Sequence, residues 1–246
     1  LGAVVLIVGG GFYLSNLFGM LGFYEISPWL GVPLTFVGLV GLINAINLID
    51  GIDGLCSGIV LMDCIFFGVW FYDCGYVEYA LLCGVLSASI VPFFFINLFG
   101  KRSKMFMGDS GALMVGFLLG AMAIKLCEMD VDARELCSVQ AVPAVVFSVL
   151  AIPVLDTLRL FVARSMRGNS PFAPDKKHLH HKLLFIFDGV HRKATFTILS
   201  LNLMFMSLGI IGRNWRNEYL ILLDIVLFSV IFYWIDVIAK RRAHKG

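Results

Sequence analysis

Four polar side chains recur every third residue near position 50 of the sequence: Asn44, Asn47, Asp50 and Asp53. A step of three residues moves only about 60° around an α-helix, so neighbouring members of this series share a face. A glycine-capped helix end does not require two carboxylates and two amides on one stripe. The pattern therefore favours a binding site, in which the intervening glycines let a ligand approach the backbone.

A second cluster, Phe106-Met-Gly108-Asp109-Ser-Gly, leads into a long apolar run. Asp109 and the serine after it are common helix N-cap residues, which is the simplest explanation. The glycines on either side favour a phosphate site instead, because the free N–H groups of a helix start attract phosphate. Mg²⁺ held by Asp109 would suit such a site, since this ion combines few protein oxygens with water and substrate phosphate.

Three histidines, His178, His180 and His181, fall within four residues and lie beside three lysines. Such a segment predicts a cationic, partly titratable surface that suits a diphosphate. A zinc site is disfavoured because no cysteine lies nearby to complete it. A solvated basic loop is the alternative, but it does not explain why three of the five histidines gather here.

The composition indicates where these clusters are located. Of the 246 residues, 59% are hydrophobic and 15% are charged, whereas an average soluble domain has about 45–50% and about 25%. These values exclude a disordered protein, a nucleic-acid binder that relies on charge, and almost any single soluble domain. Runs of about 20 mostly apolar residues, the length of a membrane span, recur along the chain.

The sequence therefore predicts an all-α, polytopic integral membrane protein with about eight transmembrane helices. The expected spans are residues 1–14, 30–48, 55–72, 79–96, 111–126, 139–161, 195–211 and 219–238.

The distribution of lysine and arginine predicts the orientation of these spans. Residues 97–110, residues 162–194 and the segment after 238 hold 14 of the 19 basic residues, which places them on the cytosolic side by the positive-inside rule. We expect one membrane-embedded domain over residues 1–246. The three loops that contain the polar clusters, 44–55, 97–111 and 163–194, would lie together on the cytosolic face.

Several acidic residues lie in or near spans without forming a cluster. Asp156 and Arg159, three residues apart, predict a local ion pair. We expect structural roles for Asp63, Asp224 and Asp236. A proton path through them would suit a transporter or flippase for lipid carriers, but the polar clusters lie at one face and not at the membrane midplane.

In their order along the chain, the three clusters resemble the signatures of the polyprenyl-phosphate N-acetylhexosamine-1-phosphate transferases, glycosyltransferase family 4. The resemblance covers about residues 31–184. Residues 170–184, which contain the histidines, are most similar to the WecA/TagO type, and the related MraY type usually carries a different histidine loop.

The resemblance implies an Mg²⁺-dependent enzyme, for which Mn²⁺ is a substitute. Such an enzyme transfers a sugar 1-phosphate, expected to be N-acetylglucosamine 1-phosphate, from a UDP-N-acetylhexosamine to undecaprenyl or another polyprenyl phosphate. It releases UMP and starts the synthesis of a cell-envelope glycan such as lipopolysaccharide. The implied location is the bacterial inner membrane with the active site facing the cytosol. The implied partners are the two substrates and the lipid bilayer, with no nucleic acid, and a homodimer is compatible with the family.

The resemblance also implies roles for individual residues. Asp109 is the expected Mg²⁺ ligand, and Asn47 is a candidate second ligand or nucleotide-sugar contact. The expected catalytic residues are Asp50, Asp53, Asp109, His180 and His181. The expected substrate-binding residues are Asn44, Asn47, Phe106, Gly108 and His178.

One departure from the family concerns a pair of adjacent aspartates in an earlier cytosolic loop, which takes part in catalysis. No Asp-Asp occurs in this sequence. We expect that the sequence lacks the N-terminal part of the family, and an inactive homologue that binds UDP-sugar is the alternative. Direct attack of the polyprenyl phosphate on the β-phosphorus is the expected mechanism, because a covalent aspartyl-phosphate route would need the absent pair.

Overall fold

The computed structural model describes residues 1–100, 105, 107–129, 139–168 and 178–243. The helices in this part are α1 (Gly2–Val4), the π-helix η1 (Val5–Gly9), α2 (Pro28–Ile49), α3 (Leu55–Asp73), α4 (Val77–Phe99), α5 (Gly108–Cys127), α7 (Val142–Val149), α8 (Ala151–Ser165), α9 (Leu179–Ile186), α10 (His191–Ile211) and α11 (Asn217–Ala243). Two short strands, β1 (Asn16–Met20) and β2 (Phe23–Glu25), complete the described elements.

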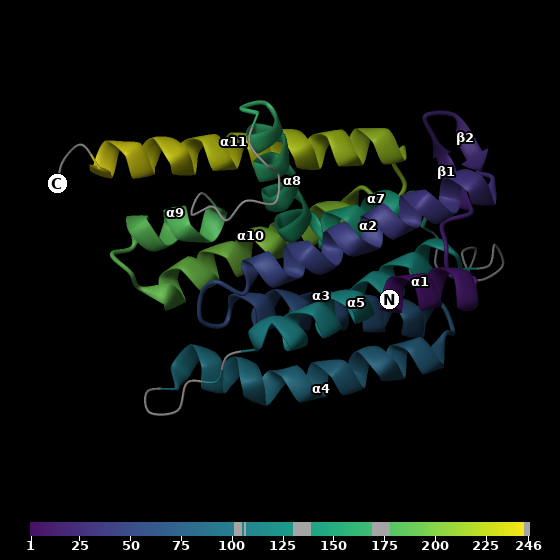
Figure 1. The fold of residues 1–246 in the computed structure, drawn as a ribbon, viewed down its shortest axis with the longest axis horizontal. Helices are drawn as coiled ribbons and strands as arrows, with labels where there is room; N and C mark the ends of the chain where they lie inside the picture. Colours follow the sequence, from purple (N-terminus) through teal and green to yellow (C-terminus); the bar gives the residue numbers. More distant parts are fainter. Residues whose placement is uncertain (101–104, 106, 130–138, 169–177, 244–246) are drawn as a thin grey trace.

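Six helices in these ranges, α2, α3, α4, α5, α10 and α11, are long and apolar enough to cross a membrane. They run lengthwise in Figure 1, with α4 along one edge of the bundle and α11 along the other. This arrangement confirms the predicted all-α, polytopic class. Within the described residues, six helices could therefore span a membrane, or seven if the bent pair of α7 and α8 is one span.

The sequence predicted about eight spans, which is more than the six or seven found within the described residues. Residues 1–14 contain only the short α1 and η1, which do not reach the length of a span. Residues 139–161 do not form one straight helix, because the helix breaks after Val149 and α8 leaves at 81° to α7. Pro153 explains the break, since a proline ring clashes with the carbonyl group four residues earlier, here that of Val149. Figure 1 shows α8 running steeply across α11, at a large angle to the lengthwise helices.

A two-stranded antiparallel hairpin, formed by β1 and β2, lies between η1 and α2. Leu21 and Gly22 have φ angles of 54° and 84°, and two positive φ angles are what a type I′ hairpin turn requires. In the sequence analysis these residues fall between two expected spans. The N–H of Leu21 donates to Oε1 of Glu218 at 2.7 Å, and Nδ2 of Asn217 donates to the carbonyl of Phe18 at 3.2 Å. The hairpin is thereby attached to the start of α11.

Helices α2 and α5 approach closely because α5 carries Gly116 and Gly120 on one face. A Cβ atom on Gly116 would lie 3.1 Å from Cα of Ile43, and one on Gly120 would lie 2.3 Å from Cδ1 of Leu39. Small residues four apart allow such contact between helices in apolar surroundings. The contact aligns the first turn of α5 with the last turn of α2.

Two buried acids inside spans have polar partners on neighbouring helices. Oδ1 of Asp63 on α3 accepts from Nδ2 of Asn202 on α10 at 3.1 Å. Oδ2 of Asp224 on α11 accepts from Oγ of Ser148 on α7 at 2.6 Å. Asp236 forms ion pairs with lysines of α9 and of its own helix. These contacts agree with the structural roles expected for the three acids.

Candidate active site

Three predicted site residues meet where α2 ends and α5 begins. Nδ2 of Asn47, in the last turn of α2, donates to Oδ1 of Asp109, in the first turn of α5, at 3.2 Å. Asp50 follows directly after α2, and its burial and the nearby Asp109 carboxylate raise its pKa from 3.8 to about 6, although a hydrogen bond from the Gly108 N–H acts against this. Asp50 and Asp109 thus form a pair of mutually repelling carboxylates that a cation would stabilise.

Asp53 is buried on the other side of the same turn, against the start of α10. Oγ1 of Thr195 donates to the carbonyl oxygen of Asp53 at 2.7 Å. Nδ1 of His191 lies 3.2 Å from the backbone nitrogen of Asp53 and 3.3 Å from its Oδ2. The sequence analysis missed His191, because a single histidine outside a motif gives no local signal. Together with Thr195, it nevertheless attaches the start of α10 to a predicted catalytic residue.

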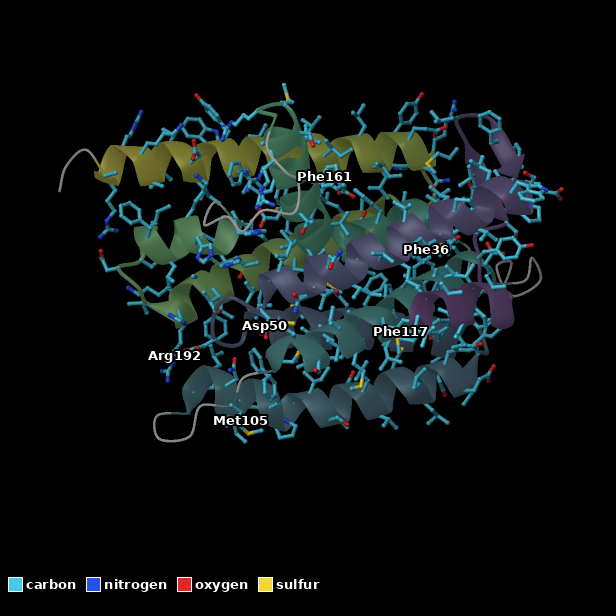
Figure 2. The ribbon with its side chains drawn as sticks, in the orientation of Figure 1. Phe36, Asp50, Met105, Phe117, Phe161 and Arg192 are labelled. Carbon is cyan, nitrogen blue, oxygen red and sulfur yellow. The ribbon has the colours of Figure 1, made fainter. Side chains whose placement is uncertain are left out.

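Asn97, near the end of α4, links two of the predicted segments. Its Oδ1 accepts from the N–H of Gly54, and its Nδ2 donates to the carbonyl oxygen of Met105. Gly54 has a φ of 75°, a left-handed conformation that glycine adopts without strain, and the helix α3 follows it. The start of α3 and the segment before α5 therefore share one anchor. Figure 2 shows Asp50, Met105 and Arg192 toward the same end of the bundle.

The three predicted histidines lie at the start of α9 and pack against one another. The ring centroids of His178 and His180 are 5.4 Å apart in a stacked arrangement, and those of His180 and His181 are 4.2 Å apart. His178 and His180 are 4% and 2% exposed, whereas His181 is partly exposed. Burial, and then the neighbouring His181 and His178 rings, lower the pKa of His180 to about 3. His180 is therefore uncharged at neutral pH, and the expectation of a cationic surface is wrong for this residue.

His180 connects the histidines to the acidic residues. A Cβ atom on Gly51 would lie 2.5 Å from Nε2 of His180, so the ring lies directly against the backbone between Asp50 and Asp53. A side chain at position 51 would displace it. The glycines were predicted to let a ligand approach the backbone, and at Gly51 the approaching group is a protein side chain.

His178 has a different partner, the carboxylate of Asp156 on α8. Nδ1 of His178 lies 2.9 Å from Oδ2 of Asp156, and Arg159 binds Oδ1 of the same carboxylate at 3.0 Å. The predicted ion pair between Asp156 and Arg159 is confirmed. The contact with His178 was not predicted, because it joins residues 22 positions apart.

Described residues from all three predicted loops thus meet at one end of the bundle, through the contacts Asn47–Asp109, Gly51–His180 and Asp53–His191. Asn44 is exposed one turn before Asn47, and its substrate contact stays a prediction. Phe106 lies outside the described residues, as do residues 101–104 and 169–177 of the predicted loops.

The donor set can be compared with what Mg²⁺ requires. No group of three or more His, Cys, Asp or Glu side chains within the described ranges is placed to hold a metal ion. The pair of Asp50 and Asp109 still fits Mg²⁺, because proteins often bind this ion through one or two carboxylates and leave the remaining positions to water and substrate phosphate. Asn47 directs its nitrogen toward Asp109, so it orients a candidate ligand, and its own role as a ligand stays a prediction.

Known proteins from several bacteria are similar to this chain. The undecaprenyl-phosphate alpha-N-acetylglucosaminyl 1-phosphate transferase of Escherichia coli (strain K12) is 29% identical over 245 residues, 97% of this chain and 63% of the relative. The protein of the same name from Haemophilus influenzae is 31% identical over 244 residues, 94% of this chain and 66% of the relative. A decaprenyl-phosphate N-acetylglucosaminephosphotransferase of Mycolicibacterium smegmatis is 37% identical over 123 residues, 48% of this chain and 30% of the relative.

The chain spans less than two thirds of the length of these relatives. The model of the family described as glycosyl transferase family 4 matches residues 1–127, more than half of the chain. This match includes the turn with Asp50 and Asp53 and the start of α5 with Asp109. The chain belongs to glycosyl transferase family 4.

Proposed function

We propose that the protein transfers N-acetylglucosamine 1-phosphate from UDP-N-acetylglucosamine to a polyprenyl phosphate and releases UMP. The observation that carries this proposal is the meeting of a carboxylate pair, Asp50 and Asp109, with the histidines of α9 at one end of the helix bundle. The names of the relatives support the sugar and the class of lipid. A donor from water and an acceptor from the bilayer would have to meet at such an end.

The acceptor needs no base to activate it. A phosphate monoester has a second pKa of about 6, so polyprenyl phosphate is largely a dianion at pH 7. One of its oxygens would attack the β-phosphorus of the donor, and a new P–O bond would form while the bond to UMP breaks. Repulsion between the two anions opposes this step. The protein would therefore act mainly by compensating charge and by aligning the reactants.

The acidic residues would bind the nucleotide part of the donor, UDP-N-acetylglucosamine. Asp109 and Asp50 would hold Mg²⁺. A bound ion would supply positive charge that neutralises phosphate oxygens and stabilises the leaving UMP. Asp53, fixed by His191, would contact the nucleotide sugar. Mn²⁺ would replace Mg²⁺ at the same carboxylates, because it also prefers oxygen ligands.

The histidines would receive the diphosphate and the sugar. The partly exposed His181 would contact the diphosphate oxygens and His178 would contact the sugar, while the uncharged His180 keeps α9 against the turn that carries the carboxylates. The apolar surfaces of the spans would accommodate the prenyl chain, at about 0.8 kcal/mol for each CH₂ group that leaves water.

We place this end of the bundle on the cytosolic side of a bacterial inner membrane, because residues 97–110, residues 162–194 and the segment after 238 hold 14 of the 19 basic residues. Single cysteines at two exposed positions test the orientation: Glu78→Cys, at the start of α4, and Lys193→Cys, at the start of α10. In whole cells, a reagent that cannot cross the membrane should label the first and spare the second. The reverse pattern would overturn the orientation. Cys56, Cys64, Cys83 and Cys127 are buried, and the protein without an added cysteine, labelled in the same way, gives the background from all its native cysteines.

UMP release by the intact protein in detergent tests the reaction itself. The assay would contain polyprenyl phosphate, Mg²⁺ and UDP-N-acetylglucosamine, with UDP-N-acetylgalactosamine as the alternative donor and Asp109→Asn as the matched protein control. Release that needs the lipid, the ion and Asp109 supports the proposal. No release with either donor, from protein shown to be inserted and folded, would contradict it and favour a role in binding or transport.

A further inference from the structure

Asp156 is a buried carboxylate to which the mechanism above gives no role. It lies on α8, seven residues after Val149 and the break in the helix, and its side chain is only 2% exposed. A buried carboxylate is costly unless hydrogen bonds and opposite charges compensate it. The groups that surround Asp156 therefore indicate what it does.

Three donors converge on this carboxylate. Its Oδ1 accepts from Nη2 of Arg159 at 3.0 Å and from the N–H of Leu179 at 3.1 Å, and its Oδ2 lies 3.2 Å from the same N–H and 2.9 Å from Nδ1 of His178. The guanidinium of Arg159 is itself held over the ring of Phe232 on α11, 3.6 Å from the centroid. Asp156 thus joins α8 to the first residues of α9 and, through Arg159, to α11.

The contact with His178 determines which ring nitrogen carries the proton. An ionised carboxylate can only accept hydrogen bonds, so Nδ1 of His178 must be the donor. Nε2 is then the nitrogen that remains for a substrate. A carboxylate that selects the tautomer of a histidine in this way is a familiar device of enzyme active sites.

The ring of His178 is also fixed by its surroundings. It is stacked on His180 with only 11° between the ring planes, and Nε2 of His180 lies against Gly51. A rotation of His178 would therefore disturb a packed series that ends at the turn between Asp50 and Asp53. The position of the ring is coupled to the position of the acidic residues.

We propose that Asp156 is a positioning residue that holds His178 with its proton on Nδ1, so that Nε2 can accept a hydrogen bond from a hydroxyl or N–H group of the nucleotide sugar. The substrate in this inference rests on the proposed function. The tautomer and its dependence on Asp156 do not.

The tautomer can be measured without any turnover. Spectra of the intact protein with ¹⁵N-labelled histidine distinguish protonated from unprotonated ring nitrogens, and His178→Gln assigns the signal. We expect a protonated Nδ1 in the wild type. Asp156→Asn keeps the size of the side chain but can turn an amide N–H toward Nδ1, so the proton should move to Nε2. An unprotonated Nδ1 in the wild type, or no change in the variant, would overturn the proposal.

Kinetics supply the second measurement. Asp156→Asn should lower kcat/KM for UDP-N-acetylglucosamine at least tenfold, and Asp156→Glu should recover part of the loss. Asp224→Asn is the matched control, because Asp224 is equally buried but bonds to Ser148 away from the histidines, and its kcat/KM should stay within twofold of the wild type. Equal losses in both variants would show a general cost of removing a buried acid and would contradict the proposal.

The two measurements separate this inference from the proposed function. If the wild type releases no UMP, the proposed reaction fails, while the ¹⁵N spectra still decide whether Asp156 controls His178. If Asp156→Asn does not fold, as judged by size-exclusion chromatography, the wild-type spectrum still provides the decisive observation.

Discussion

The two halves of the candidate site are built in opposite ways. In the acidic half, Asp109 is exposed and Asp50 is partly exposed, and burial, followed by the nearby Asp109 carboxylate, raises the pKa of Asp50 to about 6. In the histidine half, His178 and His180 are buried, and the anchoring carboxylate of Asp156 receives three donors. The carboxylates of the acidic half have negative charge available for an external cation, whereas the carboxylate of the histidine half is compensated by donors of the protein itself.

The difference suggests a division of labour between binding and alignment. Carboxylates that are not neutralised by the protein can bind a cation and its phosphates, but they contribute little to rigidity. Side chains fixed before the substrate arrives can align it without further loss of freedom. Substitutions in the two halves should therefore change different kinetic quantities, and this can be tested.

The largest effect is expected in the acidic half, at Asp109. Asp109→Asn removes a carboxylate charge next to Asp50, and Mg²⁺-dependent UMP release should fall about a thousandfold or more, because a bound metal contributes several kcal/mol to the transition state. Thermal unfolding should stay close to the wild type, since Asp109 is exposed. Retained activity would place the metal elsewhere and would remove the proposed contrast between the halves.

A smaller but still large effect is expected where the halves touch, at Gly51. The Cβ of Gly51→Ala would lie 2.5 Å from Nε2 of His180, so the ring must shift, and kcat should fall about a hundredfold from misalignment. The Mg²⁺ concentration for half-maximal activity should change little. Gly41→Ala on α2 is the matched control, because its Cβ would meet nothing within 4 Å. Similar losses in both variants would mean that the contact between the halves is unimportant.

The smallest effect is expected at His191, behind the acidic half. His191→Gln loses the ring that contacts both the backbone nitrogen and the carboxylate of Asp53. KM for UDP-N-acetylglucosamine should rise about three- to tenfold, the value of one hydrogen bond, with a smaller change in kcat. The exposed Lys193→Gln provides the control. A fall in kcat at constant KM would instead group His191 with the aligning residues.

The residues of the candidate site were easier to predict from the sequence than the residues that hold them in place. Asp50, Asp109 and His180 could be found because each lies in a local cluster of polar residues that is unusual beside an apolar run. His191 and Asp156 could not, because their contacts with the site join residues 138 and 22 positions apart. Such contacts depend on how helices pack, and no local spacing encodes them. Arg159 also gave Asp156 a sufficient partner within one helical turn.

The fold shows a similar limit. Hydropathy alone predicted the long spans because an apolar run of about 20 residues has few alternatives to a membrane helix. It did not distinguish a straight helix from a broken one, since α7 and α8 are both apolar enough to pass as one span. The signal for the break was present in Pro153, but a proline inside an apolar run does not give the direction of the bend.

Pro153 has a consequence for the chemistry, although it carries no reactive group. In an unbroken helix, Asp156 would lie about 10 Å beyond Val149 along the axis of α7. The break instead directs the start of α8, and with it Asp156, toward the first turn of α9. Substitutions of Pro153 and Asp156 should therefore be thermodynamically coupled. Once the helix is straightened, removal of a carboxylate that no longer reaches His178 should add little, and the coupling free energy of the pair would measure how much of the alignment depends on a bend in the backbone.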